Sequence, residues 1–74
     1  MKELERMLKA LANRRRLAIL KYLKENREAA VGEIADHSNL SFKATSKHLG
    51  VLAVCDVVEK DQRSLQMFYR LASS

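Results

Sequence analysis

The sequence contains no proline, no tryptophan, two glycines and a single cysteine, Cys55, among its 74 residues. One thiol excludes an internal disulfide and is consistent with a reducing cytoplasm. The longest wholly apolar run is residues 51–55, which is far too short to span a bilayer. The amino terminus mixes charges and lacks the apolar region of a secretory signal. We therefore predict a cytoplasmic protein with no membrane segment.

Signatures of catalysis and of metal binding are missing from the sequence as well. It has no glycine-rich phosphate loop, no paired carboxylates suited to a cleft, and no Ser/His/Asp arrangement with structural context. The two histidines, His37 and His48, lie on different predicted helices and have no cysteine partners. We predict a protein that is not an enzyme and that holds no metal or other cofactor.

Basic residues outnumber acidic residues by 14 to 9, which gives a net charge of +5. Residues 1–26 carry eight basic and three acidic groups, and residues 41–50 carry two basic groups and no acidic group. This distribution favours a folded basic patch over a disordered basic arm. Solubility alone is the alternative explanation for such a charge.

Helical periodicity accounts for the first two thirds of the chain. A first helix, ending near residue 12, is indicated by four apolar residues, Leu4, Met7, Leu8 and Leu11. Asn13 is a good N-cap for a second helix to about residue 26. Residues 31–35 mark a short third helix, residues 38–39 a turn, and Ser41 caps a fourth helix that extends to residue 54. Two short helices joined by a tight turn are the outline of a helix-turn-helix.

Beyond residue 56 the apolar period changes from helical to alternating. Residues 61–64 form a polar, turn-like tract, and the apolar residues that alternate after it are Leu65, Met67, Tyr69 and Leu71. We predict a β-hairpin of residues 57–61 and 65–71, whose apolar face must pack on the helices because a lone hairpin is marginally stable. The predicted fold is α+β: one winged helix-turn-helix domain over residues 1–74, with four helices followed by a two-stranded hairpin wing.

Three segments occur in the order of a known family: LKALANRRRLAIL (8–20), EIADHSNLSFKATSKHLGVL (33–52) and VVEKDQRSLQMFYRL (57–71). They resemble the helix 1–helix 2 junction, the helix-turn-helix and the wing of the ArsR/SmtB-type family of bacterial winged-helix repressors. The resemblance implies a homodimer that represses transcription at a promoter. It also implies that Arg16 anchors the second helix by a salt bridge or a carbonyl contact.

The sequence departs from the family pattern at several positions. Ala30 and Gly32 stand where metal-sensing members often have Cys-x-Cys, so we expect no metal site there. Ser38 replaces an apolar residue and buries a hydroxyl, at a cost of about 1–3 kcal/mol if the hydroxyl is unpaired. Gly50 replaces a longer polar residue, and Asp56 must adopt the backbone shape of the family glycine. The family usually continues into a C-terminal helix, which we expect to be absent or very short here. We therefore expect helix 1 to carry most of any dimer contact, through Leu4, Met7, Leu8 and Leu11.

The fourth helix has a small, basic, hydroxyl-bearing face and an apolar face. We interpret it as a recognition helix for DNA, with contacts from Phe42, Lys43, Thr45, Ser46 and Lys47. Arg63, at the predicted hairpin tip, is a further candidate for a minor-groove or phosphate contact. An ordinary solvated helix face and an exposed loop arginine are the alternatives. Cys55 is interpreted as a small buried residue, with a redox sensor as the alternative.

The sequence therefore predicts a sequence-specific regulator of transcription that binds double-stranded DNA as a homodimer and acts as a repressor. One alternative is a winged-helix protein-interaction module that has lost DNA binding. A second alternative is an RNA-binding domain, although the sequence lacks the paired surface aromatic residues of a stacking sheet.

Overall fold

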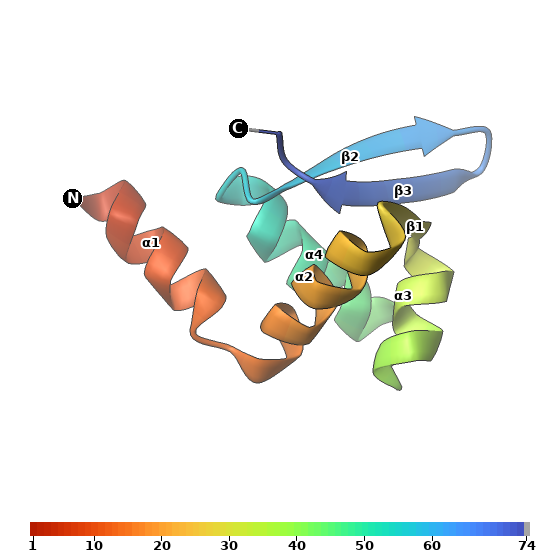
Figure 1. Ribbon diagram of the computed structural model, residues 1–74, viewed down its shortest axis with the longest axis horizontal. Coiled ribbons are helices and arrows are strands. Elements are labelled where there is room, and N and C mark those ends of the chain that lie inside the picture. Colours follow the sequence, from red (N-terminus) through yellow and green to blue (C-terminus); the bar gives the residue numbers. More distant parts are fainter. Residues whose placement is uncertain (74) are drawn as a thin grey trace.

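The computed structural model describes residues 1–73 and contains four helices and a small antiparallel sheet. The elements in chain order are α1 (Lys2–Leu11), α2 (Arg14–Asn26), β1 (Glu28–Ala30), α3 (Val31–Ser38), α4 (Phe42–Val54), β2 (Val58–Arg63) and β3 (Gln66–Leu71). The sheet has the strand order β1-β3-β2. It lies along one side of α2, α3 and α4, whereas α1 extends away from them (Figure 1). The predicted α+β class is confirmed.

Side-chain caps begin the second and fourth helices where the sequence predicted them. The side-chain oxygen of Asn13 accepts hydrogen bonds from the backbone N–H groups of Arg15, at 3.0 Å, and Arg16, at 3.1 Å. Ser41 Oγ accepts from the backbone N–H of Ala44 at 3.0 Å. Each cap satisfies N–H groups that have no partner within the first turn of a helix. Both predicted helix starts are therefore confirmed.

Three helices end at or beside a residue with positive φ, and the first of them is α2, which ends at Arg27 with a φ of 65°. Asn39 ends α3 in the left-handed conformation, with a φ of 55°, and forms the turn toward α4. Asp56, just after α4, has a φ of 60° and takes the backbone shape that the family resemblance assigns to glycine. Asn and Asp enter this region more readily than other non-glycine residues. The chain thus keeps the turns at Asn39 and Asp56 without glycine.

The sheet differs from the prediction in two ways. Residues 28–30 form a third strand, β1, that pairs antiparallel with β3 in the register Glu28↔Arg70 and Ala30↔Phe68. The alternating pattern did not identify it because Glu-Ala-Ala has low strand propensity, and pairing with β3 overrides that preference. The strand predicted over residues 57–61 begins at Val58 and continues through residues 62 and 63, so the hairpin turn contains only Ser64 and Leu65.

The hydrophobic core lies between the sheet and the three helices beneath it. Its largest fully buried apolar side chains come from α2, α3 and α4 and are Ile19, Leu23, Ile34, Leu49 and Leu52. Val58 and Tyr69 close the core from the sheet, with Met67 and Leu71 partly buried against it. Leu65 was predicted to pack on this core. That prediction is wrong, because Leu65 lies in the turn and is 96% exposed.

Ser38, the last residue of α3, buries its hydroxyl as the sequence predicted. Its Oγ is inaccessible to solvent and has no hydrogen-bond partner among residues 1–73. A buried polar group without a partner loses its hydration and gains nothing in return. The helix-turn-helix is therefore less stable than an apolar residue at this position would make it.

We predict that Ser38→Ala raises the free energy of unfolding by about 1–2 kcal/mol, because it removes the unpaired hydroxyl. Ser41→Ala is the matched control, since it deletes the cap of α4 and should lower the same quantity by about 1 kcal/mol. Urea denaturation followed by circular dichroism measures both. A loss of stability in Ser38→Ala would contradict the prediction, because it would show that the Ser38 hydroxyl makes a favourable interaction.

Candidate nucleic-acid interface

Helix α4 has two chemically different sides. Its buried side is formed by Thr45, Leu49 and Leu52, which are all 0% exposed. On its other side Lys43 and Lys47 are exposed, Ser46 is half-buried, and Phe42 is 63% exposed. No neighbouring atom lies within 4 Å of the position that a Cβ at Gly50 would occupy. The exposed side is therefore basic at Lys43 and Lys47 and ends in an apolar residue, Val54, which is 67% exposed.

Thr45 does not belong to this exposed surface. Its hydroxyl donates a hydrogen bond to the backbone carbonyl of Ser41 at 2.9 Å, and its side chain lies fully inside the core. A side chain in this position cannot reach a nucleic acid. The prediction that Thr45 contacts DNA is therefore wrong. Its hydroxyl instead makes its hydrogen bond to the backbone at the start of its own helix.

Arg16 joins α1, α2 and α4 at one point. Its Nε donates to the carbonyl of Ala10 at 2.7 Å, and its Nη2 donates to the carbonyl of Lys9 at 3.2 Å. These carbonyls belong to the last turn of α1, where intrahelical donors are missing and a cation is favoured. Its Nη1 lies 3.3 Å from Nδ1 of His48 on α4. The predicted anchoring role of Arg16 is confirmed, in its carbonyl form.

His48 lies within a group of positive charges. The pKa of His48 is lowered, mainly because the side chain is partly buried. The positive charges of Arg16, Arg15 and Lys47 lower this pKa further. The start of α2 and the exposed side of α4 therefore contribute to one basic surface. A neutral imidazole can accept the Arg16 hydrogen bond at Nδ1, whereas a protonated one cannot.

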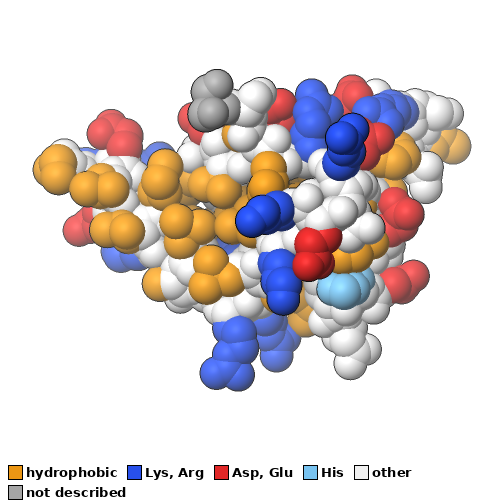
Figure 2. Space-filling view, viewed as in Figure 1, with side chains coloured by type: hydrophobic (Ala, Val, Ile, Leu, Met, Phe, Trp, Pro, Cys, Tyr) orange, Lys and Arg blue, Asp and Glu red, His pale blue; other side chains and the backbone are white. Residues whose placement is uncertain are grey.

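Helix α1 presents most of its apolar side chains to solvent. Leu4 is 47% exposed, Met7 38% and Leu8 57%, whereas Leu11 is half-buried. Ala10 is the buried residue of this helix. We call Leu4, Met7, Leu8 and Leu11 the α1 stripe. Figure 2 shows apolar side chains along α1 that continue toward the centre of the molecule. Such a continuous patch is typical of a surface that another chain covers.

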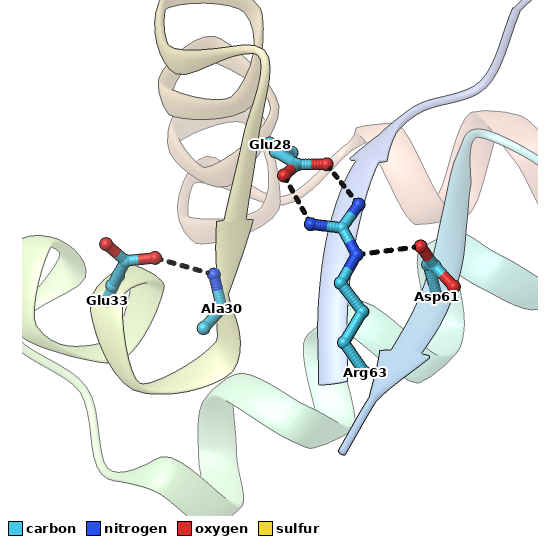
Figure 3. A network of polar contacts seen from close by, with 5 residues as sticks. All are labelled: Glu28, Ala30, Glu33, Asp61 and Arg63. Carbon is cyan, nitrogen blue, oxygen red and sulfur yellow. Dashed lines mark hydrogen bonds and ion pairs between the residues drawn. The ribbon is translucent and has the colours of Figure 1, made fainter. Parts of the chain in front are cut away.

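Arg63, the predicted wing contact, already has two carboxylate partners (Figure 3). Its Nη1 and Nη2 donate to the two carboxylate oxygens of Glu28 at 2.7 and 2.8 Å, and its Nε donates to Asp61 at 2.9 Å. These contacts lower the pKa of Glu28 and raise the pKa of Arg63. Sequence reasoning missed the bidentate pair because it depends on β1, the strand that was not predicted.

Metal coordination and membrane insertion find no structural basis in the part of the chain that is described. No three His, Cys, Asp or Glu side chains of residues 1–73 come together as a metal site would require. None of the helices over these residues is long and apolar enough to cross a membrane. Cys55, predicted to be buried, is only half-buried, and its thiol contacts the carbonyl of Arg6 at 3.7 Å.

Comparison with known proteins gives consistent results. The family model for bacterial regulatory proteins of the arsR family matches residues 13–60. The transcriptional activator HlyU of Vibrio cholerae is 41% identical over 68 residues, which are 92% of this chain and 62% of that protein. The chain thus spans less than two thirds of the length of this curated relative.

Two solved structures support the fold. The solution NMR structure of a homodimeric winged helix-turn-helix DNA-binding domain from Mycobacterium bovis is 35% identical, with a TM-score of 0.91 over 97% of this chain and 66% of that chain. HlyU from Vibrio cholerae is 38% identical in its structural alignment, with a TM-score of 0.87 over 99% of this chain and 78% of that chain. The predicted winged helix-turn-helix fold is confirmed.

The lowered pKa of His48 predicts a pH-dependent stability. The folded state binds fewer protons at His48 than the unfolded state does, so the stability is present above the ordinary pKa of 6.5 and is lost as the pH falls through the lowered value. We expect His48→Gln to reduce the loss of unfolding free energy between about pH 7 and pH 5. Urea denaturation at a series of pH values measures this, with His37→Gln as the matched control. If His48→Gln and the wild type showed the same dependence of unfolding free energy on pH, the lowered pKa of His48 would not be its cause.

Proposed function

Because the chain belongs to the ArsR family of bacterial regulatory proteins, we propose that it is a transcriptional regulator that binds double-stranded DNA with helix α4. This family consists of regulators rather than enzymes, in agreement with the sequence-based expectation. The observation that carries the proposal is the two-sided α4, whose apolar side is fully buried and whose exposed side is basic. The turn at Asn39 and the Ser41 cap present this helix at the surface.

The exposed side of α4 has side chains suited to the major groove. Lys43 and Lys47 supply amines for phosphate oxygens or guanine edges, and Ser46 supplies a hydroxyl. Phe42, at the start of the helix, is exposed enough to contact a thymine methyl group. Wing residues beside the turn at Ser64 and Leu65 would contact the flanking backbone.

We propose a homodimer that uses the α1 stripe. The Mycobacterium bovis relative is homodimeric, and the stripe is the largest set of exposed apolar side chains on one helix of this chain. A two-fold axis at α1 would place two copies of α4 in successive major grooves, about one helical turn apart. The protein would act in the cytoplasm, and repression would follow when its site overlaps a promoter. The Vibrio cholerae relative is a transcriptional activator, so activation is the alternative direction of regulation.

The alternatives are less well supported by the surface. An RNA-binding sheet needs exposed aromatic rings for base stacking. Here Tyr69 is buried, and the guanidinium of Arg63 covers the Phe68 ring at 4.6 Å from its centroid. A protein-interaction module that has lost DNA binding would not need a basic recognition helix, and salt dependence separates it from a DNA-binding protein.

The dimer is tested by Leu4→Asp and Leu8→Asp, which place a carboxylate in the α1 stripe. Both side chains are about half exposed in a single chain, so the monomer should stay folded. We expect sedimentation velocity to shift toward monomer, and DNA affinity to fall with it, because two half-sites are no longer bound together. Leu65→Asp, at the exposed hairpin turn, is the control that should stay dimeric. A dimeric Leu8→Asp variant would place the interface elsewhere.

DNA reading is tested by Lys47→Ala, with Lys24→Ala near the end of α2 as a control for charge loss. If Lys47 contacts phosphate, affinity falls for all sequences and the slope of log K against log salt becomes shallower by about 0.9 per subunit. If it contacts guanine, about 1–3 kcal/mol is lost on the specific site alone. Fluorescence anisotropy on duplex DNA at several salt concentrations measures both. Equal effects of the two substitutions would contradict the proposed role of α4.

A further inference from the structure

The outward face of the sheet is nearly neutral, although the chain as a whole is basic. Glu28 and Glu59 both lie opposite Arg70 in the register, one on each neighbouring strand, and Arg70 pairs with Glu59 at 3.3 Å. Arg63 pairs with Glu28 and with Asp61. The two arginines of this wing therefore have carboxylate partners, whereas Lys43 and Lys47 on α4 have no ion pair among the described residues.

The side chain of Arg63, the last residue of an edge strand, spans the sheet. Its side chain crosses β3 from β2, passes over the Phe68 ring, and meets Glu28 on β1 with both terminal nitrogens (Figure 3). Asp61, on the same strand, holds its Nε. The two terminal nitrogens thus bind a planar, two-oxygen anion on the outward face of the sheet, because the guanidinium extends from the end of β2 back over Phe68, away from the hairpin turn. A DNA phosphate presents the same pair of oxygen acceptors to a guanidinium.

We propose that Glu28 occupies the phosphate-binding site of Arg63, and that the guanidinium exchanges the Glu28 carboxylate for a DNA phosphate when the wing meets the duplex. This inference rests on the proposed function. It assigns Arg63 as a wing contact that is masked in the free protein and Glu28 as the residue that sets the affinity of that contact. Asp61 is a positioning residue, because its bond to Nε fixes the side chain while the two terminal nitrogens change partner.

The surroundings of the pair allow such an exchange. Both side chains are partly exposed, so neither charge has to be buried or released from a closed cavity. Exposed ion pairs contribute little net free energy, and a polyanion with its condensed counterions competes well against them. The contact would be sequence-independent, because phosphates are present at every step of the duplex. Glu28 would therefore lower DNA affinity by the same factor on specific and non-specific sequences.

The experiment compares the full chain with Glu28→Gln, using a random-sequence duplex of about three helical turns and several salt concentrations. We expect Glu28→Gln to bind about twofold to fivefold more tightly than the wild type, which is the range that exposed ion pairs account for. Glu59→Gln removes the same charge from the same face and is the matched control, with little change expected. Arg63→Gln should weaken binding and reduce the salt slope by about 0.9 per subunit.

The decisive comparison places Glu28→Gln in the Arg63→Gln background, where its gain in affinity should disappear. Thermal unfolding by circular dichroism checks that each variant is folded. Equal affinities of Glu28→Gln and Glu59→Gln, or a salt slope that Arg63→Gln leaves unchanged, would overturn the exchange while leaving the role of α4 intact. A wild-type protein that binds no duplex DNA would overturn the proposed function together with this inference.

Discussion

The arrangement of the two proposed surfaces depends on the guanidinium of Arg16. Helix α1 buries only Ala10 among its described residues, so packing alone does little to orient it. Arg16 supplies the missing donors for the carbonyls of Lys9 and Ala10, and the same group contacts His48 on α4. Arg16 thus connects α1, which carries the proposed dimer surface, to α4, which is proposed to read DNA.

In a chain this small, one helix must both build the core and form the proposed DNA-binding surface. Helix α4 uses Leu49 and Leu52 for the core and leaves its opposite side to Lys43 and Lys47. Ser38 lowers the stability of the helix-turn-helix, because its buried Oγ has no hydrogen-bond partner among residues 1–73. The wing is held by the pairing of three strands and by Val58 and Tyr69, which close the core from the sheet.

Local rules predicted the helices and their caps, because periodicity and the Asn13, Asn39 and Ser41 signals depend on neighbouring residues. The elements that were missed depend on contacts across the chain. Strand β1 forms because β3 pairs with it. Glu28, the partner of Arg63, lies on β1, 35 residues away in the sequence. Thr45 was assigned to DNA for its hydroxyl, although its spacing from Leu49 and Leu52 already placed it on the apolar side. Position on the helix, rather than residue type, decided its role.

The central claim, that α4 and the hairpin turn meet DNA, is tested most directly by NMR. The ¹⁵N-labelled protein would be titrated with a random-sequence duplex while its backbone amide signals are followed. The account predicts that the largest shifts occur in residues 42–50 of α4 and around the turn at Ser64 and Leu65, with smaller changes along the α1 stripe. Shifts confined to α1, or no shifts in a protein that remains folded, would contradict it.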